Sequence, residues 1–262
     1  MTQAEQDDEL RRVLAGEDPG MARFRNVARH IPASPRCKLC AAPFEGIGGA
    51  VFRRIGFGRF PGNPAICASC IKEFRKKGIT GAEIPVSLLF ADVRGSTGIA
   101  EGMRPAEFRG FLDGFYRIGS DVILGHDGLV DKLVGDEVIG LFFGGITGPG
   151  HAAAAIEAAI ELVARTARSD AGPAGAIPIG AGVHTGDAYV GTTGPPGAVD
   201  DFTAVGDVVN TTARLASSAA SGEVLVTIAA AEDADYETKG LERRNLQVRG
   251  RHEPVDVAVI RP

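Results

Sequence analysis

Two aspartates, each at the point where a strand-like run ends, constrain this 262-residue chain more than any other feature. Asp92 closes an apolar run over residues 86–91, and Asp136 follows Gly135 between two apolar stretches. Gly-Asp between strand-like runs is typical of a β-hairpin turn. If the first strand lies beside this hairpin, the two carboxylates meet at one end of a sheet. Such a pair holds Mg²⁺ or Mn²⁺, ions that leave coordination positions open for phosphate groups, so the pattern indicates phosphoryl-transfer chemistry.

The bulk composition narrows the class of protein. Hydrophobic residues make up 44% of the chain, as in ordinary globular proteins. The net charge of −5 argues against general nucleic-acid binding, so we expect no nucleic-acid partner. No apolar run has the length of a membrane span, and the acidic, polar start of the chain is not a secretory signal. We therefore expect a cytoplasmic protein without membrane contact, whose four cysteines stay reduced.

The chain divides into three predicted parts. Residues 1–36 are charged and predict a helical segment, residues 37–80 hold all four cysteines, and residues 82–262 alternate strands and helices. In this last part the patterns predict strands over 85–91, 177–184, 188–192, 223–227, 247–249 and 255–260, a hairpin over 128–143, and helices over 104–124, 151–167 and 207–217. This order of elements favours an α/β (α+β) fold, a ferredoxin-like βαββαβ layer with extra strands.

Four segments of the last part, taken in order, resemble the class III nucleotidyl cyclases, the family of adenylate and guanylate cyclases, and in particular its bacterial adenylate cyclases. They are LLFADVRGST (Leu88–Thr97), DKLVGDEVIGLF (Asp131–Phe142), DFTAVGDVVNTTARLAS (Asp201–Ser217) and QVRGR (Gln247–Arg251). Four ordered matches within residues 84–260 are far more specific than one motif. The resemblance implies that a ribose 3′-hydroxyl attacks the α-phosphate and that pyrophosphate leaves.

The resemblance also implies the cofactors. Asp92 and Asp136, with the Val93 carbonyl as a further ligand, would hold two Mg²⁺ or Mn²⁺ ions per active site. One ion would lower the pKa of the ribose 3′-hydroxyl, and the other would neutralise the triphosphate. The turn that contains Gly95 would present backbone N–H groups to phosphate oxygens.

Five further residues match family positions that contact the substrate. Lys132 and Thr203 stand at the base-reading positions; lysine only donates and adenine N1 accepts, so Lys132 favours ATP, whereas the Thr203 hydroxyl discriminates weakly. Asn210 and Arg214, which share one helix face, would orient the ribose and stabilise charge on the α-phosphate. Arg249 matches a position, often lysine, that grips the terminal phosphates.

The resemblance therefore predicts an adenylate cyclase that makes cyclic AMP from ATP. A guanylate or dual-specificity cyclase is one alternative, and a non-catalytic nucleotide-binding metal or redox sensor is another. In the family the metal-binding and arginine residues meet across a dimer interface. One chain carries both sets, which implies a homodimer with two shared active sites and an inactive monomer.

The cysteines form two Cys-x-x-Cys pairs, Cys37 with Cys40 and Cys67 with Cys70. Two such pairs can close on one metal ion as a Cys₄ tetrahedron. The glycine-rich segment between them holds few core-sized side chains and would struggle to fold without a metal. Zinc is the expected ion; an iron–sulfur cluster and free or redox-active thiols stay open as alternatives.

This cysteine module, residues 37–80, is also basic, with eight lysines and arginines against Glu45 and Glu73, a net charge of +6. No aromatic residues alternate with the charges as they do in many nucleic-acid-binding surfaces. These charges either solvate the module or pack on the acidic remainder of the chain. We hypothesise that the module regulates the cyclase by sensing metal or redox state.

Overall fold

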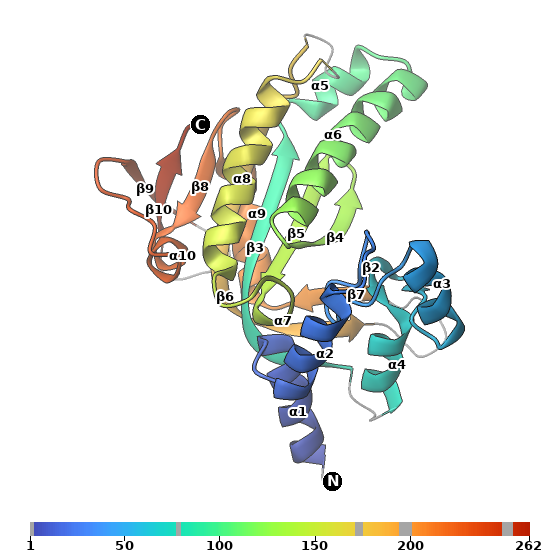
Figure 1. Ribbon diagram of the computed structural model, residues 1–262. Coiled ribbons are helices and arrows are strands. Elements are labelled where there is room, and N and C mark those ends of the chain that lie inside the picture. The colour runs from blue at the N-terminus through green and yellow to red at the C-terminus, as the bar shows by residue number, and fades with distance from the viewer. Residues whose placement is uncertain (1–2, 77–79, 171–174, 194–200, 248–253) are drawn as a thin grey trace. The chain divides into compact units, whose positions relative to one another are not determined.

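The structure, a computed structural model, describes residues 3–76, 80–170, 175–193, 201–247 and 254–262 (Figure 1). The chain forms two compact units, each with its own internal packing. Unit 1 consists of residues 1–85, 143–149 and 187–205, and unit 2 consists of residues 86–142, 150–186 and 206–262. Within the described ranges, no helix combines the length and the apolar character needed to cross a membrane.

Unit 1 contains the amino-terminal helices and the cysteine module. Its elements are α1 (Gln3–Ala15), α2 (Pro19–Arg29), α3 (Gly46–Arg54), β1 (Arg59–Phe60), β2 (Asn63–Cys67), α4 (Ala68–Lys76), α7 (Gly144–Thr147) and β7 (Asp201–Val205). Asp18 caps α2 by accepting a hydrogen bond from the Met21 N–H over 2.6 Å, and Pro19 occupies the first turn. Helices α1 and α2 thus lie within residues 1–36, where the sequence predicts a helical segment.

The amino-terminal helices of unit 1 are fixed to α7. Leu14 of α1 is fully buried, and a Cβ atom on Gly144 would lie 1.9 Å from the Ala15 carbonyl oxygen, so only glycine allows this approach. The Arg25 guanidinium of α2 donates to two carbonyl oxygens of α7, one of them that of Ile146 over 3.1 Å. Helices α1 and α2 thus pack with α7 within unit 1, although α7 is far from them in the sequence.

Unit 2 contains the larger sheet and the helices that cover it. Its elements are β3 (Gly81–Val93), α5 (Ser96–Glu101), α6 (Pro105–Gly125), β4 (Leu129–Val134), β5 (Glu137–Phe143), α8 (His151–Ala167), β6 (Ile179–Thr193), α9 (Asp207–Ser218), β8 (Val224–Thr227), α10 (Ile228–Asp233), β9 (Glu242–Leu246) and β10 (Val255–Ile260). Strands β3, β5 and β6 extend into unit 1. Neighbouring strands follow the order β4-β5-β3-β6-β8-β10-β9.

This order confirms the predicted fold. The succession β3-α6-β4-β5-α8-β6 is the ferredoxin-like βαββαβ unit, and β8, β10 and β9 extend its sheet. Strand β8 shows how the two faces are used. Val224 and Val226 pack into the cluster formed with α6 and α8, whereas Leu225 between them packs with Leu215 of α9. Because alternate residues of a strand point to opposite faces, α6 and α8 cover one face and α9 covers the other (Figure 1).

Most predicted elements of unit 2 are confirmed, with α8 at the predicted residues 151–167. The predicted separation of residues 177–184 and 188–192 into two strands is wrong, because β6 runs through residues 185–187 without a break. The Thr185 hydroxyl is buried and bonds the Ser87 Oγ over 2.7 Å, which favours continued extended pairing over a turn. The strand predicted over residues 247–249 lies largely outside the described residues, and β9 ends just before it.

Candidate active site and cysteine centre

The two aspartates that the sequence singles out lie together in unit 2. Asp92 is the penultimate residue of β3, and Asp136 lies in the turn between β4 and β5, after Gly135 with its φ of +61°. The Val93 N–H donates to the Asp136 carbonyl oxygen over 3.0 Å, which joins the end of β3 to the hairpin. Ser96 Oγ donates to Asp136 Oδ2 over 2.5 Å and orients that carboxylate. The sheet therefore brings both carboxylates to one end, as expected.

Burial and nearby negative charge disfavour the ionisation of two acidic side chains at this sheet end, Asp92 and Glu137. Burial raises the pKa of Asp92 above its usual value; the positive charge of Arg94 opposes this rise and the negative charge of Asp136 adds to it. Burial also raises the pKa of Glu137, with further contributions from Asp92 and Asp136. A bound divalent cation would relieve this repulsion, and carboxylate oxygens are the donors that Mg²⁺ and Mn²⁺ prefer. The residues present therefore fit the expected cations.

The turn after Asp92 adopts a conformation that depends on glycine. Gly95 has a φ of +69° and is the N-cap of α5, and its carbonyl accepts a hydrogen bond from the Ile99 N–H over 3.1 Å. That this turn binds phosphate oxygens stays a prediction. That the Val93 carbonyl is a metal ligand also stays a prediction.

The two predicted base-reading residues lie on strands of different units, and each is described within its own. Lys132 lies on β4 with its side chain 36% exposed, and its Nζ is 3.9 Å from Asp131 Oδ2. Thr203 lies on β7 of unit 1, paired with Gly191 of β6, and is buried. Their roles toward a base stay predictions.

The predicted ribose and phosphate residues lie on the outer face of α9. Asn210 and Arg214 are both exposed, whereas Val208 and Leu215 on the other face are buried. Exposed polar groups above a buried apolar face are the usual pattern of a surface helix, so the roles of Asn210 and Arg214 toward a substrate stay predictions. Arg249, the predicted terminal-phosphate residue, lies outside the described residues.

No sequence pattern identifies the polar side chains that surround the two aspartates as site residues. Arg94 forms an ion pair with Asp92, and Tyr116 of α6 donates its hydroxyl to the Gly135 carbonyl oxygen over 2.5 Å. Arg94 and Ser96 belong to the segment Leu88–Thr97, which carries part of the family resemblance. The directions of their side chains, however, depend on the geometry of the turn. Tyr116 carried no signal beyond the helical pattern of α6.

The four cysteines of unit 1 form one buried cluster. Their Sγ atoms all lie within 4.8 Å of one another, with 3.7 Å between Cys40 and Cys67 and 3.4 Å between Cys67 and Cys70. A tetrahedral zinc ion with Zn–S bonds of about 2.3 Å separates its sulfurs by about 3.8 Å. Backbone N–H groups also point at two of the sulfurs: Cys67 N–H donates to Cys37 Sγ over 3.2 Å, and Cys70 N–H donates to Cys67 Sγ over 3.4 Å. The geometry fits a single ion.

The thiols of this cluster titrate together. Burial opposes ionisation of Cys37, but hydrogen bonds from the other three thiols lower its pKa below the usual value. The pKa values of Cys40 and Cys70 are raised, first because each thiol donates to Cys37 and further because both are buried. Without a cation Cys37 therefore ionises in preference to Cys40 and Cys70, whereas a bound metal ion stabilises all four cysteines as thiolates.

Comparison with known proteins agrees with the fold. Residues 82–260 match the family described as the adenylate and guanylate cyclase catalytic domain. An adenylate cyclase of Anabaena cylindrica is 32% identical over 133 residues, which cover 50% of this chain and 26% of that protein. The chain thus spans about a quarter of the length of that relative.

Two solved structures extend the comparison. The guanylyl cyclase Cya2 aligns with a TM-score of 0.63 and 26% identity, covering 69% of this chain and 93% of that one. The adenylyl cyclase CyaB from P. aeruginosa aligns with a TM-score of 0.60 and 25% identity, covering 70% and 97%. Because the family match spans most of the chain and includes β3, the β4–β5 hairpin and α9, the chain belongs to the family of adenylate and guanylate cyclase catalytic domains.

Proposed function

We propose that this chain converts ATP to 3′,5′-cyclic AMP and pyrophosphate. The observation that carries the proposal is the meeting of Asp92 and Asp136 at one sheet end, where Glu137 adds a third acid. Burial and neighbouring carboxylates raise the pKa values of Asp92 and Glu137. Acids gathered in a partly buried place at the cost of their own ionisation indicate a site built for a cation.

The chemistry follows from the residues around that site. Asp92 and Asp136 would hold two Mg²⁺ or Mn²⁺ ions, which when bound lower the pKa of the ribose 3′-hydroxyl and neutralise the triphosphate. Asn210 would orient the ribose, and the planar, permanently charged Arg214 would stabilise charge on the α-phosphate. Arg249 would bind the terminal phosphates. Attack in line on the α-phosphate needs no covalent enzyme intermediate, so the side chains act by positioning and charge stabilisation.

The choice between ATP and GTP rests on Lys132. An ammonium group donates to the acceptor N1 of adenine but meets a hydrogen on N1 of guanine. The Thr203 hydroxyl can accept from the adenine amino group but can equally donate to a guanine oxygen. GTP or dual use is the second candidate, favoured by the likeness to the guanylyl cyclase Cya2.

A homodimer with two shared sites would complete the proposed enzyme. Asn210 and Arg214 are exposed on α9, away from the buried face of that helix. The β4–β5 hairpin also exposes apolar side chains beside the candidate site, with Leu133 at 41% and Val134 at 55%. Exposed apolar side chains next to functional groups are typical of an interface that a second chain covers.

At the cysteine centre the bound ion would be zinc. The sulfur separations match one tetrahedral ion, whereas a four-iron cluster binds each thiolate through a different iron and spreads the sulfurs further apart. The four thiolates and the backbone N–H donors leave no open coordination position, which is typical of a structural zinc site.

The deciding experiment measures products from ATP and from GTP with purified protein, in Mn²⁺ and in Mg²⁺. We expect cyclic AMP, and we expect Asp136→Ala to abolish it. Asp113→Ala, at an exposed aspartate on α6, is the matched control and should retain activity. No product from either nucleotide would favour a nucleotide-binding sensor, and cyclic GMP as the main product would favour a guanylate cyclase.

A further inference from the structure

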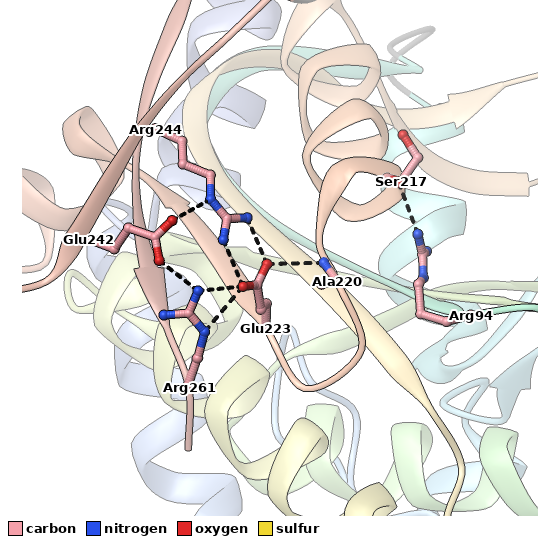
Figure 2. A network of polar contacts seen from close by, with 7 residues as sticks. All are labelled: Arg94, Ser217, Ala220, Glu223, Glu242, Arg244 and Arg261. Carbon is pink, nitrogen blue, oxygen red and sulfur yellow. Dashed lines mark hydrogen bonds and ion pairs between the residues drawn. The ribbon is translucent and has the colours of Figure 1, made fainter.

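The Arg94 guanidinium contacts two functional elements of unit 2 at once, and Figure 2 shows its contact with Ser217. One terminal nitrogen donates to Asp92 Oδ2, and Nε lies 3.3 Å from the Asp92 carbonyl oxygen. The other terminal nitrogen donates to the Ser217 carbonyl oxygen in the last turn of α9, over 2.9 Å. The Arg94 N–H also donates to the Pro178 carbonyl oxygen over 2.7 Å, which fixes the backbone from which the side chain extends.

The position of Ser217 makes this contact informative. Carbonyl oxygens in the last turn of a helix have no partner within the helix and carry partial negative charge, so a cationic side chain binds them well. Just beyond α9, the Ala220 N–H donates to Glu223 Oε2 over 3.0 Å, and Arg244 and Arg261 hold that carboxylate (Figure 2). The end of α9 is therefore held on one side by Glu223 and on the other by Arg94.

The two partners of Arg94 belong to different halves of the proposed reaction. Asp92 would hold a divalent cation, and α9 carries Asn210 and Arg214, which would contact the ribose and the α-phosphate. A cation that binds Asp92 must compete with the guanidinium already paired there. When that pair breaks, the Arg94 side chain no longer joins the Asp92 carboxylate to the end of α9.

We infer that Arg94 is a positioning residue that joins the metal-binding end of β3 to α9 and competes with the divalent cation for Asp92. This inference rests on the proposed function. In the proposed dimer, Asp92 and Arg214 of one chain serve different active sites. Arg94 would therefore pass the state of the cation site in one active centre to the helix that completes the other.

Two substitutions separate the charge of Arg94 from its link to α9. Arg94→Ala removes both. We expect Mn²⁺ to bind about 3- to 10-fold more tightly to this variant, because a positive charge that repels the ion near the protein surface is lost. We also expect backbone amide exchange over residues 215–219 to become about 10-fold faster, because the C-terminal turn loses a hydrogen bond to its carbonyls. Arg94→Lys keeps the charge but lacks the fork that reaches both partners, so Mn²⁺ affinity should stay near the wild-type value while exchange still becomes faster.

The experiment combines Mn²⁺ titration calorimetry and amide hydrogen exchange on the full chain. Arg109→Ala removes an exposed arginine of α6 and is the matched control for loss of one charge. If Arg94→Ala matches this control in both measurements, or if it weakens Mn²⁺ binding, the inference is overturned. If the wild type binds no Mn²⁺, the proposed cation site is wrong, and the proposed competition between Arg94 and the cation for Asp92 is wrong with it. The exchange comparison in metal-free protein tests the link to α9 separately.

Discussion

Lys132 lies where the proposed site would meet the nucleotide base, on the strand that leads into the Asp136 turn. Its side chain is only partly exposed, and its ammonium group lies 3.9 Å from the Asp131 carboxylate. The ammonium group only donates hydrogen bonds, so it suits the acceptor N1 of adenine and not the N1–H of guanine. Selectivity for adenine should therefore depend on this single ammonium group.

Exchanging the donor for an acceptor tests this dependence. Lys132→Glu should lower the ratio of kcat/KM for ATP to that for GTP by about 10-fold or more, since a carboxylate accepts from guanine N1–H and repels adenine N1. The measurement is the pair of kcat/KM values under one set of metal conditions. Lys239→Glu makes the same charge change at an exposed position and should leave the ratio unchanged. An unchanged ratio in Lys132→Glu would exclude this residue as the base reader.

Single residues also show what the sequence could and could not predict about the site. Asp92 and Asp136 were predictable because strand ends are visible as the end of an apolar run, and the strand order then brings them together. Arg94 and Ser96 were not, because their partners depend on a turn with a left-handed glycine and on carbonyl oxygens of residues far along the chain. A pattern of residue types carries no information on such contacts.

Glu223 is the centre of an ion-pair cluster that joins β8, β9 and the end of β10 (Figure 2). Its side chain is 6% exposed and receives two hydrogen bonds of 2.7 Å from Arg244 and one of 2.6 Å from Arg261. Glu242 accepts a further hydrogen bond from each arginine. Because the outer strands of the sheet are short, this cluster should contribute measurably to their stability.

The shifted pKa of Glu223 determines how the stabilisation by this cluster changes with pH. Arg244 above all lowers the pKa to about 2, from 4.5 for an unperturbed glutamate. A lowered folded-state pKa means that the stabilisation is present above pH 4.5 and is lost as the pH falls toward 2. Because Arg261 is exposed, solvent screens its interaction with Glu223. We therefore expect Glu223→Gln to lower the unfolding free energy by about 2 kcal/mol at pH 7.

Urea unfolding of the wild type and of Glu223→Gln at several pH values checks this. The difference between the two proteins should shrink as the pH falls from 4.5 toward 2. Glu101→Gln, at an exposed position on α5, is the control and should change the unfolding free energy little. A difference that stays constant over this pH range would mean that the carboxylate charge is not what stabilises these strands.

Among the helices and strands, length and glycine content separate those that the sequence predicted from those that it missed. The long helices α6 and α8 carry enough apolar repeats to be recognised. Helix α3 was missed because Gly46, Gly48 and Gly49 are weak helix formers. The structure gives a reason for one of them: a Cβ atom on Gly49 would lie 2.4 Å from the Phe44 carbonyl carbon. Packing, which a local pattern does not show, requires glycine there.

The cysteine module of unit 1 has four sulfurs that could hold a metal ion. In the described part of the chain, the module holds two short helices and a two-stranded sheet around the four sulfurs. Few large side chains are buried in it apart from Leu39, Phe44, Phe60, Ile66 and Ile71. A core this small needs a further source of stability, which a zinc ion bound by four thiolates would supply.

Removing the ion should therefore unfold the module. We expect one zinc per chain by elemental analysis, and we expect Cys67→Ser to lose it and to accelerate amide exchange over residues 37–70. Ser69→Ala, within the same Cys-x-x-Cys pair, should keep both the zinc and the protection. If Cys67→Ser also changes cyclase activity or its response to oxidants, the module regulates the enzyme. If activity, oxidant response and dimer formation are all unaffected, the regulatory hypothesis is wrong.

The proposed dimer makes a prediction that no single chain could satisfy. Asp92→Ala removes a metal ligand, and Arg214→Ala removes the phosphate-stabilising arginine, so each variant alone should be inactive. In a mixed dimer of shared sites, one site carries both substitutions and the other carries neither. Random pairing makes half of the dimers mixed, so refolding the two variants together should restore about a quarter of wild-type activity. Refolding each variant with itself is the control. If the mixture stays inactive while mass measurement shows mixed dimers, each chain holds its own complete site.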